Sequence, residues 1–269
     1  MTYDDFEHLV FERRPNGVLV ITMNRPEKLN AVTTSMHREL GEIWATIRRD
    51  PETRVAVITG AGRAFSAGGD LTEDMVKLGD AEKIISMGEE ARAIVYNMID
   101  LDKPIISAIN GPAAGAGLAV ALTADISIIA ENARLTDAHT RIGVASGDHA
   151  LLLWPLFCGI PKAKLYLLTA DLIDGKEAER IGLVSRCVPS DKLMETALGY
   201  ADRLALYPQR ALRWTKRSLN HWLRQAAPIF DLSVAQEGLN FLEPDASEGL
   251  KAFAEKRKPK FPSAPDERT

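Results

Sequence analysis

The chain has 269 residues, of which 46% are hydrophobic and 26% charged, and its formal net charge is −4. This composition is typical of a soluble globular protein and gives no indication of a surface for nucleic acid or anionic membranes. The first residues are acidic and lack an apolar signal segment, and no run approaches the roughly 20 apolar residues of a membrane span. We therefore expect a cytoplasmic protein with no membrane or nucleic-acid partner. Cys158 and Cys187 lie in apolar surroundings, which favours reduced thiols over a disulfide.

Strands alternate with helices in the first part of the chain. Two strands joined by Pro15-Asn16-Gly17 predict a hairpin. An amphipathic helix is predicted over residues 34–49. The next predictions are strands over residues 55–59, 103–108, 126–130 and 134–136, and helices over residues 81–100 and 118–124. This alternation indicates an α/β chain with a parallel sheet.

The rest of the chain is predicted to be mainly helical. Helices are expected over residues 161–169, 175–181, 191–206, 208–223 and 228–241, with one short strand near residues 183–187. A shift in composition near residue 190 divides the chain into a core of residues 1–190 and a helical region of residues 191–269.

Two loops of small residues follow predicted strands. One lies within residues 109–119, where a strand, a turn and a helix expose backbone N–H groups at a helix N-terminus. The other lies within residues 62–71 and is again rich in glycine. Each loop can donate one N–H group to the same carbonyl oxygen, which is what an oxyanion hole requires. Tight packing of a helix on a strand is the alternative explanation for the small residues.

At these loops the sequence resembles the crotonase superfamily, which contains the enoyl-CoA hydratases and isomerases. The resemblance runs in order along nearly the whole chain, and its motifs are weak singly but specific together. They are residues 24–31 (NRPEKLNA), 65–71 (FSAGGDL), 109–111 (ING), 115–117 (GAG), 124–126 (ADI), 179–184 (ERIGLV) and 253–261 (FAEKRKPKF). The resemblance implies a spiral of repeated β-β-α units followed by a helical C-terminal region that packs in trimers, and hence a homotrimer or a dimer of trimers.

The resemblance also implies a site. Gly69 and Ala116 are expected to donate the backbone N–H groups that polarise an acyl thioester carbonyl, with Ala116 standing where the family usually has glycine. The two carboxylates of an enoyl-CoA hydratase should fall at Ala119 and His139, so the sequence departs from the hydratase pattern.

His139 with Asp148 is predicted as the acid/base pair in place of those carboxylates. The pair is similar to the dyad of the crotonase-fold β-diketone hydrolases. Asp137 is an alternative partner, because residues 135, 137, 139 and 141 alternate along a predicted extended segment and share one face. A plain helix N-cap is the alternative role for Asp148.

The other histidines are weaker candidates. His149 is expected to be structural, as are His8, His37 and His221. No group of histidines and cysteines has metal-ligand spacing, so we expect no metal.

The resemblance places a coenzyme A moiety on basic and loop residues. These are Arg25, Lys28, Ala67, Gly68, Asp70, Leu71, Lys256 and Lys258. Lysine or arginine would balance the phosphates, although a solvated basic helix end also accounts for the last two. Coenzyme A is part of the substrate, and no separate cofactor is expected. The acyl pocket is expected to be lined from residues 75–84 and 151–157.

Three functions follow. The first is an acyl-CoA-processing enzyme of the enoyl-CoA hydratase/isomerase type, which stabilises a thioester enolate and uses His139 and Asp148. The second is a hydrolase that breaks a C–C bond in a β-diketone or β-keto thioester. The third is an acyl-CoA-binding protein without catalysis.

Overall fold

The computed structural model describes residues 2–70 and 78–265. Within these residues a central six-stranded sheet has the order β1-β2-β3-β4-β6-β9. Only β1 is antiparallel to its neighbour; the pairs from β2 to β9 are parallel. The strands are β1 (Leu9–Arg13), β2 (Val18–Met23), β3 (Val55–Gly60), β4 (Ile105–Ile109), β6 (Ile126–Ala130) and β9 (Arg186–Val188).

A second, smaller sheet lies beside the site. It pairs β5 with β7 in parallel and β7 with β8 in antiparallel orientation. Its strands are β5 (Ala113–Ala114), β7 (Arg134–Thr136) and β8 (Ile173–Asp174).

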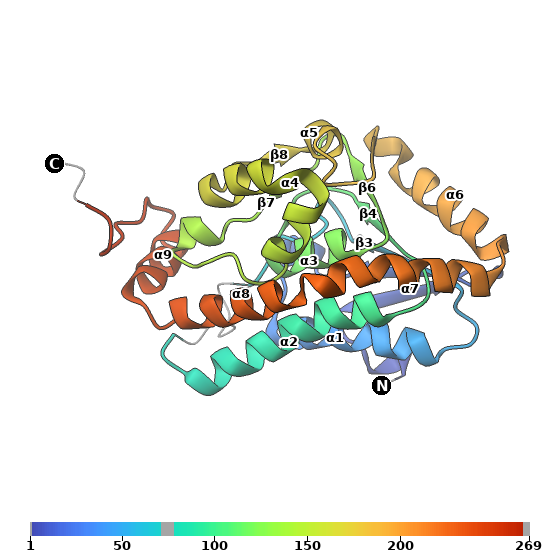
Figure 1. Ribbon diagram of the computed structural model, residues 1–269, viewed down its shortest axis with the longest axis horizontal. Helices are drawn as coiled ribbons and strands as arrows, with labels where there is room; N and C mark the ends of the chain where they lie inside the picture. The colour runs from blue at the N-terminus through green and yellow to red at the C-terminus, as the bar shows by residue number, and fades with distance from the viewer. Residues whose placement is uncertain (1, 71–77, 266–269) are drawn as a thin grey trace.

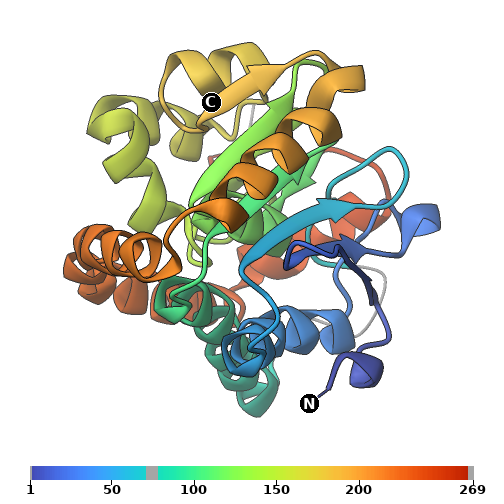
Figure 2. The ribbon, with the colours of Figure 1, turned by 90° about the vertical axis from the view of Figure 1, so that its right-hand side faces the viewer.

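Helices cover the sheet and make up most of the described chain after β9 (Figures 1 and 2). The helices of the core are α1 (Thr34–Arg49), α2 (Ala81–Asp100), α3 (Gly115–Thr123), α4 (Ala150–Thr169) and α5 (Gly175–Arg180). The later helices are α6 (Leu193–Leu206), α7 (Gln209–Gln225), α8 (Ala227–Asn240) and α9 (Pro244–Ala254). Short 3-10 turns are η1 (Tyr3–Asp5), η2 (Pro26–Lys28), η3 (His139–Ile142) and η4 (Ser190–Lys192). This confirms the expected α/β arrangement with a helical C-terminal region.

The core lies between the sheet and the first helices. Strands β3 and β4 are buried along their whole length, as expected for parallel strands covered on both faces. Helix α1 buries one face that includes Leu40, Ile43 and Trp44, whereas α3 is buried from Ala116 to Thr123 because it has neighbours all round. Helix α8 lies beside α2, so two helices that are far apart in sequence pack against each other (Figure 1).

Asparagine side chains tie the loop after β3 to the segments that follow β4, through Asn110, and β2, through Asn30. The Asn110 amide Nδ2 donates to the carbonyl oxygens of Gly60 and Gly62, both at 3.0 Å. The Asn30 amide donates to the carbonyl of Ala61 at 2.9 Å and that of Ala64 at 2.8 Å. These bonds fix the loops that carry the predicted N–H donors.

Three sequence predictions need correction. The segment predicted to be extended through residue 141 ends at Thr136, and η3 begins at His139 because the chain turns at Ala138. Helix α4 begins before the predicted residue 161 and continues past Gly159, where the backbone is not helical (φ 76°, ψ 156°). Helix α9 was not predicted as a separate element, since its start at Pro244 follows α8 closely.

Helix α4 also departs from the expectation that no segment is long and apolar enough to cross a membrane. Among the described residues, it is the one helix that is long and apolar enough, and 28% of its 18-residue apolar stretch is buried. Its helical geometry is interrupted at Gly159, which lies between Pro155 and Pro161. One such helix is weak evidence, because core helices of soluble proteins meet the same criterion.

Candidate active site

Two backbone N–H groups are positioned by the paired loops. Gly69 forms a parallel bridge with Val32, in which Val32 donates to the Gly68 carbonyl at 2.8 Å and Asp70 donates to the Val32 carbonyl at 2.9 Å. In such a bridge the N–H of Gly69 itself points to the opposite side. Ala116 lies in the first turn of α3, where backbone N–H groups have no partner within the helix.

The loops approach closely because small residues face each other. A side chain on Gly115 would place its Cβ 3.4 Å from the Gly68 Cα and 3.7 Å from the Gly69 nitrogen. Gly68 and Gly115 have positive φ angles of 90° and 47°, which glycine adopts without strain. The same Cβ would lie 3.9 Å from Oδ2 of Asp148, so the donor loops and the acidic residues meet at one place.

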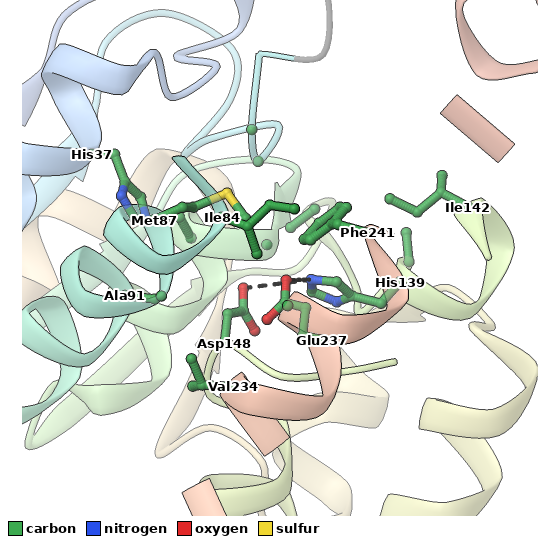
Figure 3. A pocket seen from close by; sticks show the side chains of 18 of the residues that line it. His37, Ile84, Met87, Ala91, His139, Ile142, Asp148, Val234, Glu237 and Phe241 are labelled. Carbon is green, nitrogen blue, oxygen red and sulfur yellow. Dashed lines mark ion pairs between the residues drawn. The ribbon is translucent and has the colours of Figure 1, made fainter. Parts of the chain in front are cut away.

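A cavity with a volume of about 180 Å³ opens over these loops (Figure 3). Helices α2 and α8 supply most of its apolar wall. Its ionisable groups are His37 from α1, His139 from η3, Asp148 from the loop before α4 and Glu237 from α8. It is lined by His37, Ala67, Gly68, Gly69, Ile84, Met87, Gly88, Ala91, Ala114, Gly115, Ala116, Ala138, His139, Ile142, Asp148, Val234, Glu237, Gly238, Phe241 and Phe253.

His139 is surrounded by carboxylates. Its Nδ1 lies 2.8 Å from Oδ1 of Asp137, which also accepts a hydrogen bond from the Ser146 hydroxyl at 2.9 Å. Its Nε2 lies 3.4 Å from Oε1 of Glu237 and 3.9 Å from Oδ2 of Asp148. Asp137 is therefore the carboxylate that orients the ring. Asp148, predicted for that role, instead faces the other ring nitrogen from across the cavity (Figure 3).

Asp137 contacts His139 as expected, although the two residues do not share the face of a strand. The turn at Ala138 folds the chain so that the carboxylate of Asp137 reaches both the backbone N–H of His139, at 3.4 Å, and its imidazole. A turn thus brings together two residues that alternation along a strand was expected to align.

The carboxylates determine the protonation of His139. Burial lowers the pKa of His139, but the charges of Asp137 and Asp148 outweigh burial and raise it well above its ordinary value. Burial favours the neutral form of Asp137 and Asp148, yet the histidines beside them hold the pKa of both below its ordinary value. The raised pKa favours the imidazolium form of His139 in the free site, so this member of the predicted acid/base pair is suited to donate a proton.

Glu237 is a carboxylate of the site that the sequence analysis missed. Burial raises its pKa, against the opposing effect of His139. The signal lies in the helical spacing, because Phe230, Ser233, Val234 and Glu237 form the buried face of α8. A glutamate on an otherwise buried face indicates a functional or paired carboxylate.

Two histidines expected to be structural lie at the site. His149 is fully buried, and its Nδ1 lies 2.5 Å from Oδ1 of Asp148. His37 lines the cavity from α1, and its Nδ1 lies 2.8 Å from Oε2 of Glu90. Their helical and apolar surroundings in the sequence hid this placement.

The predicted coenzyme A residues are dispersed. Ala67 and Gly68 line the cavity. The Arg25 guanidinium donates to Oδ2 of Asp70 at 3.2 Å and to the Ala31 carbonyl at 2.6 Å, so these two predicted residues pair with each other. Leu71 lies outside the described residues.

The three predicted lysines lie on the surface. Lys28 ends η2, and Lys256 and Lys258 follow α9 beside Arg257, which pairs with Glu248 and Glu255. Phe253, at the end of α9, does reach the cavity.

The predicted acyl lining is only partly right. From the first stretch, Ile84 lines the cavity, and residues 75–77 lie outside the described residues. Residues 151–157 do not line it, because α4 leads away from the cavity after Ala150. Leu156 and Phe157 instead line a separate groove beside α7.

Asp137, Asp148 and His149 offer ligand atoms within 4.8 Å of one another, which is compatible with a metal ion. Both nitrogens of His149 already have partners, Asp148 and Trp154, and the His139 ring lies beside both carboxylates. His139 thus supplies counter-charge to both carboxylates. The absence of a metal stays a prediction.

Comparisons with known proteins agree with one another. A model of the family described as enoyl-CoA hydratase/isomerase matches residues 13–264. The 1,2-epoxyphenylacetyl-CoA isomerase of Escherichia coli (strain K12) is 33% identical over 91% of this chain and 95% of its own length. A crystal structure of an enoyl-CoA hydratase/isomerase from Mycobacterium paratuberculosis has a TM-score of 0.86 and 35% identity, covering 91% of this chain and 97% of that one. The structure of a β-diketone hydrolase from the cyanobacterium Anabaena sp. PCC 7120, bound to (S)-3-oxocyclohexyl acetic acid, has a TM-score of 0.81 and 30% identity. It covers 89% of this chain and 96% of that one.

Proposed function

Because this chain belongs to the enoyl-CoA hydratase/isomerase family of acyl-CoA-processing enzymes, we propose that it transfers a proton to or from a carbon of an acyl-CoA through an enolate. The observation that carries the proposal is the meeting of two elements at one cavity. The paired donor loops border it on one side, and His139 with its carboxylates borders it on the other.

The donor loops act on the thioester carbonyl. Its oxygen accepts hydrogen bonds from the N–H groups of Gly69 and Ala116, and these bonds strengthen as negative charge develops on the oxygen. One such donor typically contributes about 10²–10³-fold to the rate. Ala116 serves as well as glycine would, since the donor is the backbone.

Proton transfer belongs to the ionisable cluster. His139, protonated in the free site, delivers its Nε2 proton to the enolate or to a leaving group. Glu237 is the stronger base of the two facing carboxylates, because burial raises its pKa whereas that of Asp148 is lowered. Asp148 stabilises the imidazolium. This division of roles replaces the paired glutamates of the hydratase pattern.

The remaining features of the proposal rest on the family. Coenzyme A enters as part of the substrate, with Lys28, Lys256 and Lys258 as partners for its phosphates and no further cofactor. We place the enzyme in the cytoplasm as a homotrimer or dimer of trimers. An apolar groove beside α7, which leaves Leu219 and Trp222 more than half exposed, supports assembly.

The test uses purified protein, calorimetry with CoA and with crotonyl-CoA, and a turnover assay on the same sample. Binding and turnover are expected. In deuterated water, His139→Gln should lose about 10²–10⁴-fold in turnover or α-proton exchange while it keeps its affinity for CoA. Wild-type rates in this variant, or no binding of CoA or crotonyl-CoA, would refute the proposal.

A second function is favoured by one observation. The β-diketone hydrolase from Anabaena shares 30% identity and the fold with this chain, and a histidine between carboxylates suits activation of water for C–C cleavage. A cyclic β-diketone assayed beside crotonyl-CoA separates the two functions. Ring opening of the diketone without affinity for CoA would establish the hydrolase.

A further inference from the structure

A chain of contacts behind Asp148 has no role in the reaction as derived so far. Asp148 offers Oδ2 to the cavity side, where His139 Nε2 lies 3.9 Å away. Its other oxygen, Oδ1, meets His149 Nδ1 at 2.5 Å. Beyond His149, the indole Nε1 of Trp154 lies 3.4 Å from His149 Nε2. His149 and Trp154 are both fully buried.

The indole of Trp154 determines where the protons lie in the series of contacts from Trp154 through His149 to Asp148. An indole N–H donates and cannot accept, so Nε2 of His149 must present a lone pair to Trp154. A neutral imidazole with a free Nε2 carries its proton on Nδ1. That proton points at Asp148, which therefore accepts it as an ionised carboxylate.

The backbone holds His149 in this position. His149 is the N-cap of α4, and its carbonyl oxygen accepts hydrogen bonds from the N–H groups of Leu152, at 3.1 Å, and Leu153, at 3.0 Å. Trp154 follows within the first turns of the same helix and packs its ring near Tyr166, with centroids 6.5 Å apart. The start of α4 thus places donor, imidazole and carboxylate in a fixed order.

We infer that His149 is a positioning residue for the reaction, which Trp154 locks in the Nδ1–H tautomer so that Asp148 stays ionised and presents Oδ2 to His139. The inference about the tautomer stands on geometry alone, whereas its effect on turnover rests on the proposed function.

The arrangement differs from that of His139, which also donates from Nδ1 to an aspartate. His139 has Glu237 and Asp148 near its Nε2 and can take a second proton there. His149 has an N–H donor at that position and cannot do so without losing its bond to Trp154. Of the ionisable groups in this cluster, Asp148 and Asp137 interact with His149. His139 from the segment after β7, His37 from α1 and Glu237 from α8 interact with Asp148.

The first measurement is the tautomer itself. The full-length protein is labelled with ¹⁵N in histidine, and two-bond ¹H–¹⁵N correlations are recorded at neutral pH. The signal of His149, identified by its loss in His149→Asn, should show a protonated Nδ1 and an unprotonated Nε2. A protonated Nε2 on this ring, as the other tautomer or as an imidazolium, would overturn the inference whatever the substrate.

The second measurement is the pH profile of crotonyl-CoA turnover in three variants. His149→Leu removes the donor to Asp148 and should lower kcat about 10- to 100-fold with little change in KM. His149→Asn keeps an N–H close to the position of Nδ1 and should recover most of that loss. Trp154→Phe keeps an aromatic ring but removes the N–H donor to Nε2, so the pH profile of its turnover should differ from that of the wild type.

The outcomes separate this inference from the proposed function. If His149→Leu and His149→Asn lose activity equally, or if Trp154→Phe keeps the wild-type pH profile, His149 does not position Asp148. If the wild-type protein turns over no acyl-CoA while the Nδ1–H tautomer is observed, the proposed function is wrong but the inferred tautomer of His149 is correct.

Discussion

At the scale of single residues, α3 passes very close to the loop after β3. A Cβ on Gly117 would lie 2.3 Å from Cβ of Ser66 and 2.5 Å from its Oγ, inside van der Waals contact. We expect Gly117→Ala to destabilise the protein by about 1–3 kcal/mol, because the loop must shift, and to lower activity by displacing the Ala116 N–H. Urea unfolding and turnover of the same variant check both effects.

The matched control is Gly199, which lies inside helix α6 with nothing within 4 Å of an added Cβ. Gly199→Ala should raise the free energy of unfolding by about 0.5–1 kcal/mol and leave turnover unchanged. Equal effects of the two substitutions would show that contact with Ser66 does not limit position 117.

The protonation of His139 gives the stability of the protein a pH dependence. Its pKa is raised in the folded protein above the ordinary value of 6.5, so the folded state holds this proton more tightly than the unfolded chain does. The resulting stabilisation is complete below about pH 6.5 and is lost as the pH rises through the folded pKa. The difference in unfolding free energy between the wild type and His139→Gln should therefore shrink from pH 6 to pH 9.5. A difference that grows with pH would contradict the assigned protonation state.

The residues of the site differ in how far the sequence could predict them. Gly69 and Ala116 stand in short motifs that can be recognised in the sequence, and His139 stands at a position that the family resemblance marks. The structure brings all three to one cavity. Glu237 comes from a helix almost a hundred residues after His139, and only the packing of α8 against the site brings it there. The choice between Asp137 and Asp148 depends on the turn at Ala138, which the alternating pattern concealed.

At the scale of elements, helix α7 is joined to the sheet by a buried cation. Lys216 Nζ lies 2.7 Å from Oδ2 of Asp125 and donates to the Lys103 carbonyl at 2.9 Å. We expect Lys216→Met to lower the free energy of unfolding by about 2 kcal/mol, because the charge-assisted bonds are lost while the aliphatic packing is kept. Denaturant unfolding measures the loss.

Lys192 offers the matched control for that substitution. It pairs with Glu195 at 2.9 Å, but both side chains are more than half exposed. Lys192→Met should therefore change stability by less than about 1 kcal/mol. If both variants lose the same free energy of unfolding, burial does not explain how much the contacts of Lys216 stabilise the protein.

Elements were more predictable than their ends. Helix α2 and strands β6 and β7 have the predicted bounds, because apolar periodicity and nearby turn residues coincide there. The start of α4 was missed, since Pro155 and Gly159 read as breaks although Leu152 to Trp154 already pack as a helix. Helical periodicity showed that the region after residue 190 folds into helices, but not that α8 would lie against α2.

At the scale of the whole molecule, the exposed apolar side chains bear on assembly. The groove beside α7, which residues of α4 and α6 also line, has a volume of about 600 Å³. It includes Leu156, Leu219 and Trp222, which are 48%, 60% and 66% exposed. Apolar surface of this kind is covered in most stable proteins. Light scattering on the full-length chain should give three or six times the 29.5 kDa of one chain.

Substitution inside and outside the groove tests what holds that assembly together. Trp222→Glu places a charge in the groove and should shift the mass toward that of one chain at micromolar concentration, because an unpaired carboxylate resists burial. Val10→Glu adds the same charge at a half-exposed position on edge strand β1, outside the groove, and should leave the mass unchanged. If the wild type is monomeric, the assembly proposal fails at once. If Trp222→Glu assembles as the wild type does, the interface lies elsewhere on the surface.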